Sequence, residues 1–335
     1  MKEFLGRVSG GENLSMTEMS DVIDTIMQGK ASEQEIALLL TALSAKGETV
    51  DEVAGAAAAM RKHMTHIRSG RGNLVDTCGT GGGGAGTFNI STAAAIVAAA
   101  AGANIAKHGN RRMTSKTGSA DVLAELGVNI EASVSTVEKC LDELGLCFCF
   151  APLLHNAMKH VGPVRRQLGV PTIFNLLGPL CNPANAPFQV LGVGRSEIRN
   201  LLAGALSRLG TQRSVVVHGE DGLGEVTLAA ATSVTLVEGE QLRELTWNPQ
   251  DFGLEPADMQ TMLADDPPAS AATIREILAG TPGPPRDITV MNAAAALWIS
   301  GRSDSLSECT QLAAESIDSG AASEKLSRLA EVSCS

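Results

Sequence analysis

The first 70 residues carry apolar side chains at the three- to four-residue spacing of amphipathic helices. Three S/T-x-x-E sequences, at 15–18, 32–35 and 49–52, have the spacing of a capping box, in which a hydroxyl and a carboxylate satisfy backbone groups at a helix start. After the second box, the apolar stripe runs from Ile36 to Leu43. Residues 1–70 are therefore predicted to form a small all-helical domain of three short helices, used for packing or dimerisation; a bundle that binds another partner is the alternative.

From residue 73 onward, apolar β-rich runs alternate with helical patterns. The predicted strands lie near 73–75, 103–106, 147–151, 188–193, 214–218 and 233–237, and the predicted helices lie at 117–126, 134–144 and 196–209. This alternation predicts a large α/β domain (73–335) with a central, mostly parallel sheet flanked by helices. Residues 248–286 are predicted as surface loop and short helix, and Asp287 as the cap of the next helix. Helices near 155–185 are candidates to pack on the helical domain.

Composition narrows the class of protein. The chain has 335 residues, 44% hydrophobic and 19% charged, which is typical of a soluble globular protein. Its net charge of −11 argues against nucleic-acid or anionic-membrane binding, because affinity for polyanions comes mainly from Lys and Arg. The seven cysteines show no metal-ligand grouping and indicate free thiols in a reducing compartment. Because the sequence shows neither a signal-peptide core nor an apolar stretch long enough for a membrane span, we expect a cytoplasmic protein.

The strongest local signal is a window between Asp76 and Asp121 that contains no carboxylate, although acids outnumber bases 37 to 26 in the chain. Six glycines lie within residues 79–86, and the NIST sequence at 89–92 begins an alanine-rich helix. Glycines let backbone N–H groups approach an anion, and a helix start adds the positive end of a dipole. Rossmann and Walker A loops do not fit, because the ribose-binding acid and the GK[ST] ending are both missing. The window indicates a phosphate cradle rather than a flexible surface loop.

Basic residues gather in the second half of this window. Lys107, His108, Arg111, Arg112 and Lys116 follow a predicted strand directly. Ligands of open α/β sheets lie beyond the carboxyl ends of strands, so this segment is a second candidate for phosphate binding. The alternative, a solvated basic turn, is weakened by Gly109, which permits close approach, and by the TSKTGS sequence at 114–119.

Two later segments are further candidates for chemistry. Residues 144–196 contain no acid but include Arg165, whose planar guanidinium suits a carboxylate or a phosphate; from the residues alone, pairing with a distant surface acid is an equal alternative. His155, in the same segment, can equally be an ordinary polar residue. At 220–225 a strand runs into an acidic loop, which suits Mg²⁺ because that ion takes a few carboxylates plus phosphates and water; a plain hydrophilic turn is the alternative.

Taken together, the motifs resemble a known family. GTGG with GTFNIST (79–92), KHGNR (107–111), GSADVLAELG (118–127), GPVRRQLG (162–169), TIFNLLGPLCNP (172–183) and VVHGEDGL (216–223) are similar to anthranilate phosphoribosyltransferase, of the nucleoside phosphorylase/phosphoribosyltransferase class with a helical N-terminal domain. The resemblance covers nearly the whole chain. It implies transfer of the 5-phosphoribosyl group from 5-phosphoribosyl-1-pyrophosphate (PRPP) to anthranilate with Mg²⁺, as in tryptophan biosynthesis, by a homodimer joined through helical domains. The products would be N-(5-phosphoribosyl)anthranilate and pyrophosphate.

The resemblance also implies roles for individual residues. Asn110, Arg165 and Lys107 would be catalytic, and Ser91 and Glu225 would bind the metal. The residues expected at PRPP are Gly79, Gly82, Gly83, Thr87, Asn89, Ile90, Ser91, Thr92, Lys107, His108, Gly109, Asn110, Arg111, Arg112, Ser115 and Ser119. Those expected at anthranilate are Gly79, Asn110, His108, Ala151, Pro152, His155, Arg165 and Pro179, with Arg165 gripping the carboxylate.

Three positions depart from the family pattern. Gly83 stands in a GTGGDG-type motif and Gly224 in a DGLDE-type motif where an Asp is usual, and Asn156 replaces a common proline. The two lost carboxylates predict weakened or altered Mg²⁺ dependence, with Glu225 as the main protein carboxylate and Asp221 as a partial substitute.

Two rival functions share this fold. A pyrimidine nucleoside phosphorylase would run the reverse type of reaction with phosphate, but KHGNR with GPVRRQLG favours an aromatic acid over a nucleobase. A non-catalytic paralogue that binds nucleic acid or a partner is supported by the lost carboxylates, while the pI of about 5.1 argues against nucleic acid.

Overall fold

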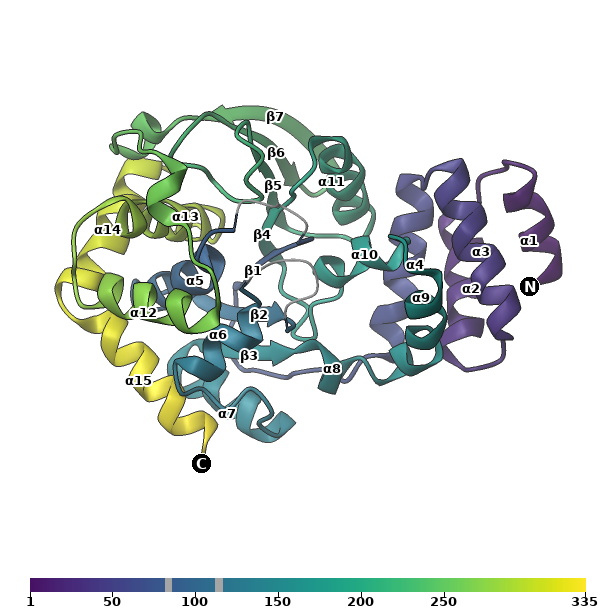
Figure 1. The fold of residues 1–335 in the computed structure, drawn as a ribbon, viewed down its shortest axis with the longest axis horizontal. Coiled ribbons are helices and arrows are strands. Elements are labelled where there is room, and N and C mark those ends of the chain that lie inside the picture. The colour runs from purple at the N-terminus through teal and green to yellow at the C-terminus, as the bar shows by residue number, and fades with distance from the viewer. Residues whose placement is uncertain (82–85, 112–116) are drawn as a thin grey trace.

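The protein is described by a computed structural model that covers residues 1–81, 86–111 and 117–335. A small helical lobe lies at one end of an elongated molecule, and a larger lobe built on a β-sheet makes up the rest (Figure 1). The N-terminal helices of the small lobe are α1 (Lys2–Ser9), α2 (Met16–Met27), α3 (Glu33–Lys46) and α4 (Val50–His63). All three predicted capping boxes are confirmed, at the starts of α2, α3 and α4.

The sequence predicted three helices in this region, and α1 is a fourth. This helix has no side-chain N-cap and buries only Leu5 and Val8. Because it has neither a capping sequence nor a long apolar stripe, it carries little of the signal that revealed the other three helices.

A seven-stranded sheet in the order β3-β2-β1-β4-β5-β6-β7 forms the centre of the large lobe. Its strands are β1 (Leu74–Gly79), β2 (Asn104–Gly109), β3 (Leu146–Phe150), β4 (Phe188–Gly192), β5 (Arg213–Gly219), β6 (Thr232–Glu238) and β7 (Gln241–Trp247). The first five strands pair in parallel, and β6 and β7 are antiparallel. The predicted α/β class with a mostly parallel sheet is confirmed. The prediction missed β7, because most side chains of this edge strand are exposed and form no apolar run.

Helices cover both faces of the sheet (Figure 1). On one face, Val75 and Ile105 belong to a buried cluster with α5 (Ile90–Ala100) and α13 (Pro284–Ile299). On the other face, Leu191 and Val216 belong to a second cluster with α11 (Arg199–Arg208) and the helical lobe. The other helices of the large lobe are α6 (Ser119–Glu125), α7 (Val134–Leu144), α12 (Pro267–Leu278), α14 (Leu306–Asp318) and α15 (Ala321–Ser333). Because successive side chains of a strand point to opposite faces, the same strands serve both cores.

A stretch of short helices joins β3 to β4. It contains α8 (Ala151–Leu154), η1 (Asn156–His160), α9 (Gly162–Leu168), α10 (Phe174–Leu177) and η2 (Gly178–Leu180), where η denotes a 3₁₀ turn. Its buried residues Val161, Val164 and Phe174 belong to the same cluster as the core of the helical lobe. This stretch therefore connects the edge of the sheet with the small lobe.

The C-terminal half corrects two details of the prediction. Asp287 lies inside the first turn of α13, whose N-cap is Gly283 without a side-chain cap, so Asp287 is not the predicted cap. Residues 248–286 are more ordered than predicted, because α12 buries Ala271, Ile274 and Ile277 on one face. Further 3₁₀ turns lie at Ser196–Ile198, Pro249–Phe252 and Met259–Met262. Within the described ranges, no helix has the length and apolar character needed to cross a membrane.

Candidate active site

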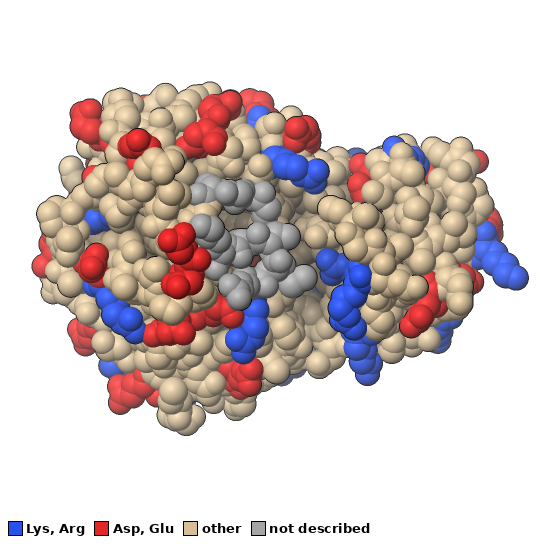
Figure 2. Space-filling model, viewed as in Figure 1, with Lys and Arg blue, Asp and Glu red and all other residues tan. Residues whose placement is uncertain are grey.

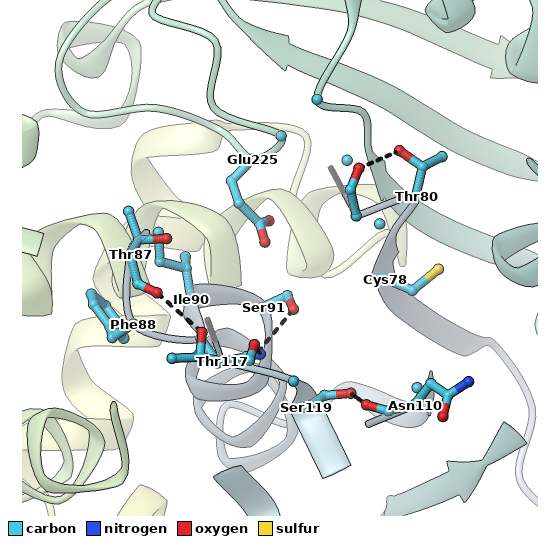
Figure 3. Close-up of a pocket in the computed structure, with 18 of the residues that line it drawn as sticks. Cys78, Thr80, Thr87, Phe88, Ile90, Ser91, Asn110, Thr117, Ser119 and Glu225 are labelled. Atoms are coloured by element: carbon cyan, nitrogen blue, oxygen red, sulfur yellow. Dashed lines mark hydrogen bonds between the residues drawn. The ribbon is translucent and has the colours of Figure 1, made fainter. Parts of the chain in front are cut away.

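The strand order reverses at β1, which lies between β2 and β4. A cavity of about 270 Å³ opens at the carboxyl ends of these strands. In open α/β sheets such a switch point is the usual place for a ligand. The cavity is lined from several directions: by the end of β1, the start of α5, the end of β2, the start of α6 and the loop at 223–225 (Figure 3).

The start of α5 is fixed by Asn89. The side-chain oxygen of Asn89 accepts the N–H of Thr92 at 3.1 Å and the hydroxyl of Ser91 at 3.3 Å, and its amide donates to the carbonyl of Thr117 at 3.0 Å. The backbone N–H of Asn89 donates to Ser270 Oγ at 2.9 Å. These bonds hold a helix N-terminus and the Ser91 hydroxyl at the cavity, where both can meet an anion.

Lys107 supplies a buried positive charge next to this helix start. Its ammonium donates to the carbonyl of Thr77 at 2.5 Å and to Ser91 Oγ at 3.0 Å. Burial lowers the pKa of Lys107, while the charges of Asp76, Cys78 and Glu225 act in the opposite direction. The Lys107 side chain is thus held against the helix start at the cavity, as binding of a polyanion would require.

Glu225 points into the cavity toward the start of α5 (Figure 3). Burial raises the pKa of Glu225 to about 7, and the positive charge of Lys107 opposes that rise. A cation bound beside this carboxylate would favour its ionised form.

The donor set around Glu225 fits Mg²⁺ only when a phosphate ligand shares the ion. Within the described ranges, no group of three His, Cys, Asp or Glu side chains could hold a metal. Mg²⁺ is commonly held by one or two carboxylates plus substrate phosphates and water, so Glu225 with the Ser91 hydroxyl would fit the protein's share of such a site. Asp221 does not line the cavity, because its carboxylate accepts the Leu223 N–H at 3.1 Å and the Thr227 hydroxyl at 2.6 Å within its own turn.

His108 follows Lys107 along β2 and points to the opposite face of the sheet. Its Nδ1 donates to the carbonyl of Gly178 at 3.1 Å, and its Nε2 lies 3.1 Å from Nε2 of His155. Burial, with the nearby His155, lowers the pKa of His108 to about 3, and burial lowers the pKa of His155 to about 4. Both rings are therefore neutral near pH 7, and because His108 Nδ1 carries the proton, His108 Nε2 is the acceptor that faces His155.

Arg165 lies on α9, in the stretch that leads to the helical lobe. Its guanidinium lies 3.3 Å from Asn175 Oδ1 and 5.7 Å from the centroid of the Phe174 ring. Burial lowers the pKa of Arg165, but a guanidinium stays charged at neutral pH. Across residues 1–81, 86–111 and 117–335, Arg165 forms no ion pair with a carboxylate, so the alternative of pairing with a surface acid is wrong.

The predicted site residues fall into three groups. Those that line the cavity are Gly79, Thr87, Asn89, Ile90, Ser91, Lys107, His108, Gly109, Asn110, Arg111, Ser119, Gly224 and Glu225. Those outside its lining are Thr92, whose side chain is fully buried, and Ala151, Pro152, His155, Arg165 and Pro179, which belong to the 151–180 stretch. Gly82, Gly83, Arg112 and Ser115 lie outside the described residues.

Some lining residues were missed by the sequence analysis. Gly192 ends β4 and Gly194 follows it at the cavity, and a Cβ on Gly192 would clash with the carbonyl of Gly224. The LGVG sequence at 191–194 was therefore a usable signal for a crowded strand end. Ser270, which holds Asn89, gave no such signal because it lies 181 positions away in the chain.

Family comparisons agree with both lobes. The model described as "Glycosyl transferase family, helical bundle domain" matches residues 2–64, and the one described as "Glycosyl transferase family, a/b domain" matches residues 71–323. The anthranilate phosphoribosyltransferase of Rhodopirellula baltica is 54% identical over 322 residues, which cover 96% of this chain and 94% of that protein.

Solved structures extend the similarity to three dimensions. The crystal structure of anthranilate phosphoribosyltransferase from Thermus thermophilus matches with a TM-score of 0.92 and 42% identity, over 99% of both chains. The Saccharomyces cerevisiae enzyme in complex with PRPP and Mg matches with a TM-score of 0.89 and 29% identity, over 99% of this chain and 97% of that one. The similarity spans nearly the whole chain in sequence and in fold, and the chain therefore belongs to the anthranilate phosphoribosyltransferase family.

Proposed function

We propose that this protein transfers the 5-phosphoribosyl group of PRPP to the amine of anthranilate, giving N-(5-phosphoribosyl)anthranilate and pyrophosphate in tryptophan biosynthesis. The observation that carries the proposal is the cavity at the switch point, where a helix start, Lys107 and Glu225 converge within the fold of this family. On the face seen in Figure 2, several Lys and Arg side chains gather where the two lobes meet, as binding of two anionic substrates would require.

On the donor side, the phosphates of PRPP would lie against the start of α5 and the end of β2. The helix N-terminus at Asn89 supplies the positive end of a dipole and holds the Ser91 hydroxyl, and Lys107 supplies a positive charge. Both are fixed before the substrate arrives, so little reorganisation is needed as negative charge develops on the leaving pyrophosphate. Mg²⁺ would neutralise part of that charge, and Glu225 with Ser91 is the donor set that would hold it.

On the acceptor side, Arg165 would grip the carboxylate of anthranilate through its planar fork. The Asn110 side-chain oxygen accepts the Arg111 N–H at 2.7 Å, so its amide nitrogen is the end that can donate to substrate. The neutral rings of His108 and His155 would form a wall without charge. An aromatic amine is already neutral at pH 7, so alignment with the anomeric carbon can replace a strong base.

The decisive assay follows anthranilate fluorescence with PRPP across a Mg²⁺ titration. We expect a PRPP-dependent loss of signal, and its Mg²⁺ dependence would report how far Glu225 suffices as the protein carboxylate. Folded protein that binds PRPP but consumes no anthranilate at any Mg²⁺ level would instead favour the non-catalytic paralogue. Phosphorolysis of thymidine would favour the nucleoside phosphorylase, and a salt-dependent gel shift would favour nucleic-acid binding.

We further propose a cytoplasmic homodimer joined through the helical lobes. Support for the dimer comes from α3, which exposes 52% of Leu38, and from a 220 Å³ groove lined by Leu40, Leu168 and Val170. Support for the reducing compartment comes from the seven cysteines, all of which are free thiols. A Leu38→Glu variant should shift the mass measured by light scattering toward the monomer, and a monomeric native protein would contradict the dimer.

A further inference from the structure

Three polar side chains lie side by side on the sheet face that otherwise packs against the helical lobe. They are Asp76 on β1, His108 on β2 and Gln189 on β4, which are 0%, 6% and 4% exposed. Asp76 and Gln189 are direct partners in the parallel register, and their strand neighbours farther along this face are apolar, such as Leu191. Burial of polar groups in an apolar layer is unfavourable unless each finds a partner, so the contacts of these three residues explain why they are there.

Gln189 provides the central contact. Its amide nitrogen lies 2.6 Å from the carbonyl oxygen of Pro179, 3.4 Å from Asp76 Oδ2 and 3.1 Å from Cys78 Sγ. The backbone carbonyl of Pro179 can only accept, so the chemistry fixes which end of the amide faces it. Gln189 therefore holds the η2 turn (Gly178–Leu180) onto β4.

His108 holds the same turn from the neighbouring side. Its ring donates to the carbonyl of Gly178 at 3.1 Å, and its backbone N–H donates to Asp76 Oδ1 at 3.0 Å. Asp76 thus accepts from the side chain of Gln189 and from the backbone of His108, the two residues that hold the turn. From the helical lobe, Arg61 on α4 donates to the carbonyl of Leu180 at 2.7 Å, so the turn is fixed between the sheet and the small lobe.

This network belongs to the acceptor side of the site. Pro179 and His108 are residues at which the acceptor is expected, whereas Lys107, on the opposite face of β2, contacts the donor side through Ser91. Displacement of the η2 turn would therefore move the acceptor wall and leave the start of α5 unchanged. Burial lowers the pKa of Lys107 and the charge of Asp76 raises it, so a substitution at Asp76 would affect the donor side as well as the acceptor side. A substitution at Gln189 is therefore the cleaner test.

We infer that Gln189 is a positioning residue for the aromatic acid acceptor, acting through its hydrogen bond to Pro179 and its link through Asp76 to His108. This inference rests on the proposed transferase function. A side chain that only stabilised the fold would affect both substrates alike. A side chain that places the acceptor wall changes acceptor binding and acceptor choice, and leaves PRPP binding unaffected.

The test is Gln189→Met, which keeps the length of the side chain but removes both amide donors. We expect KM for anthranilate to rise about tenfold, as for the loss of one well-placed hydrogen bond, while KM for PRPP changes less than about twofold. The ratio of kcat/KM for anthranilate to that for 4-fluoroanthranilate should also change, because the wall against the ring has moved. Equal changes in both KM values, or no change in either, would overturn the inference.

Two further variants keep the test decisive. Ser214→Ala removes another fully buried polar group of the sheet, whose Oγ lies 2.6 Å from Thr211 Oγ1, and should leave both KM values unchanged. If Gln189→Met does not fold, Arg61→Met loosens the same turn from the helical lobe and should raise KM for anthranilate selectively by about threefold; no selective rise there would overturn the inference. Native protein without transferase activity would refute the proposed function itself, whatever the variants do.

Discussion

At the carboxyl ends of the strands, the two faces of the sheet form the two halves of the site in different ways. On the proposed donor side, the start of α5 and the end of β2 come from residues 76–119, and a capped helix start and the buried Lys107 supply the positive potential. On the proposed acceptor side, His108 comes from β2, and His155, Arg165 and Pro179 come from three places along the 151–180 stretch; long-range contacts hold His108, His155 and Pro179. Strand β2 shows the division directly, since Lys107 points to one face and His108 to the other.

The two halves of the site therefore depend on different parts of the fold. The donor side depends mainly on residues 76–119, which the 262–270 segment braces through bonds to Phe88 and Asn89. The acceptor side depends on how the helical lobe, the 151–180 stretch and the sheet pack together. Substitutions should therefore affect one substrate at a time, and four predictions follow in order of expected effect.

The largest effect is expected from Lys107→Met. Removing the buried ammonium takes a positive charge from the donor side and leaves the Thr77 carbonyl and the Ser91 hydroxyl without their donor. We expect kcat/KM for PRPP to fall about 100-fold, the scale expected when a charge-assisted hydrogen bond is removed at a reacting centre. Steady-state kinetics would measure it. Lys325→Met is the control, because Lys325 donates to the Leu144 carbonyl and does not line the cavity; an equal loss there would contradict the assignment.

Arg165→Gln should produce the converse selectivity. Loss of the guanidinium fork should raise KM for anthranilate about 30-fold and leave KM for PRPP nearly unchanged. The neighbouring Arg166 is exposed on the same helix, so Arg166→Gln serves as a matched control with little expected effect. If both variants have the same KM for anthranilate, Arg165 does not bind the anthranilate carboxylate.

The buried histidine pair predicts a pH effect on stability. The pKa values of His108 and His155 are lowered to about 3 and 4 in the folded protein, against an ordinary 6.5. The unfolded chain therefore binds more protons below pH 6.5, and the contribution of the pair is lost as pH falls, at up to roughly 1.4 kcal/mol per pH unit for each histidine. Glu225, with its pKa raised to about 7 from 4.5, acts in the opposite sense between those values.

A variant separates these opposing contributions. Urea unfolding at pH 7 and pH 5 should show a smaller loss of stability in His155→Phe than in the native protein, because Glu225 is the same in both. His66→Asn changes an exposed histidine and should leave the pH dependence of the unfolding free energy as it is in the native protein. An equal pH dependence of the unfolding free energy in His155→Phe and in the native protein would contradict the buried neutral pair.

The smallest effect is expected from Gly224→Asp, which restores a carboxylate beside Glu225. A Cβ at Gly224 would lie 3.2 Å from the backbone nitrogen of Gly194 and the carbonyl carbon of Val193, so the loop must shift slightly to accept it. We expect Mg²⁺ affinity of the PRPP complex to rise only about threefold. Isothermal titration would measure it, and two tight, ordinary metal sites in the native protein would contradict the weakened Mg²⁺ dependence.

Much of this protein was determined locally and could be predicted from the sequence. The capping boxes at Ser15, Ser32 and Thr49 form because each hydroxyl and its Glu are three residues apart, a spacing that the helix itself brings together. The α/β alternation follows from apolar periodicity, and the glycines and helix cap that predict a phosphate cradle lie in one short window. The α1 helix and β7 were missed because one lacks a cap and the other is an exposed edge strand.

Tertiary structure alone decided the rest. The sequence could not show that Arg165 contacts Asn175, that Asp221 closes its own turn, or that His108 and His155 share a hydrogen bond. It also could not show that Gln189 meets Asp76 and Pro179, because that contact depends on strand order and register. Local hydrogen bonds and periodicity are encoded within a few residues. Packing between distant segments is set by the whole core, so the acceptor half of the site appears only in the folded protein.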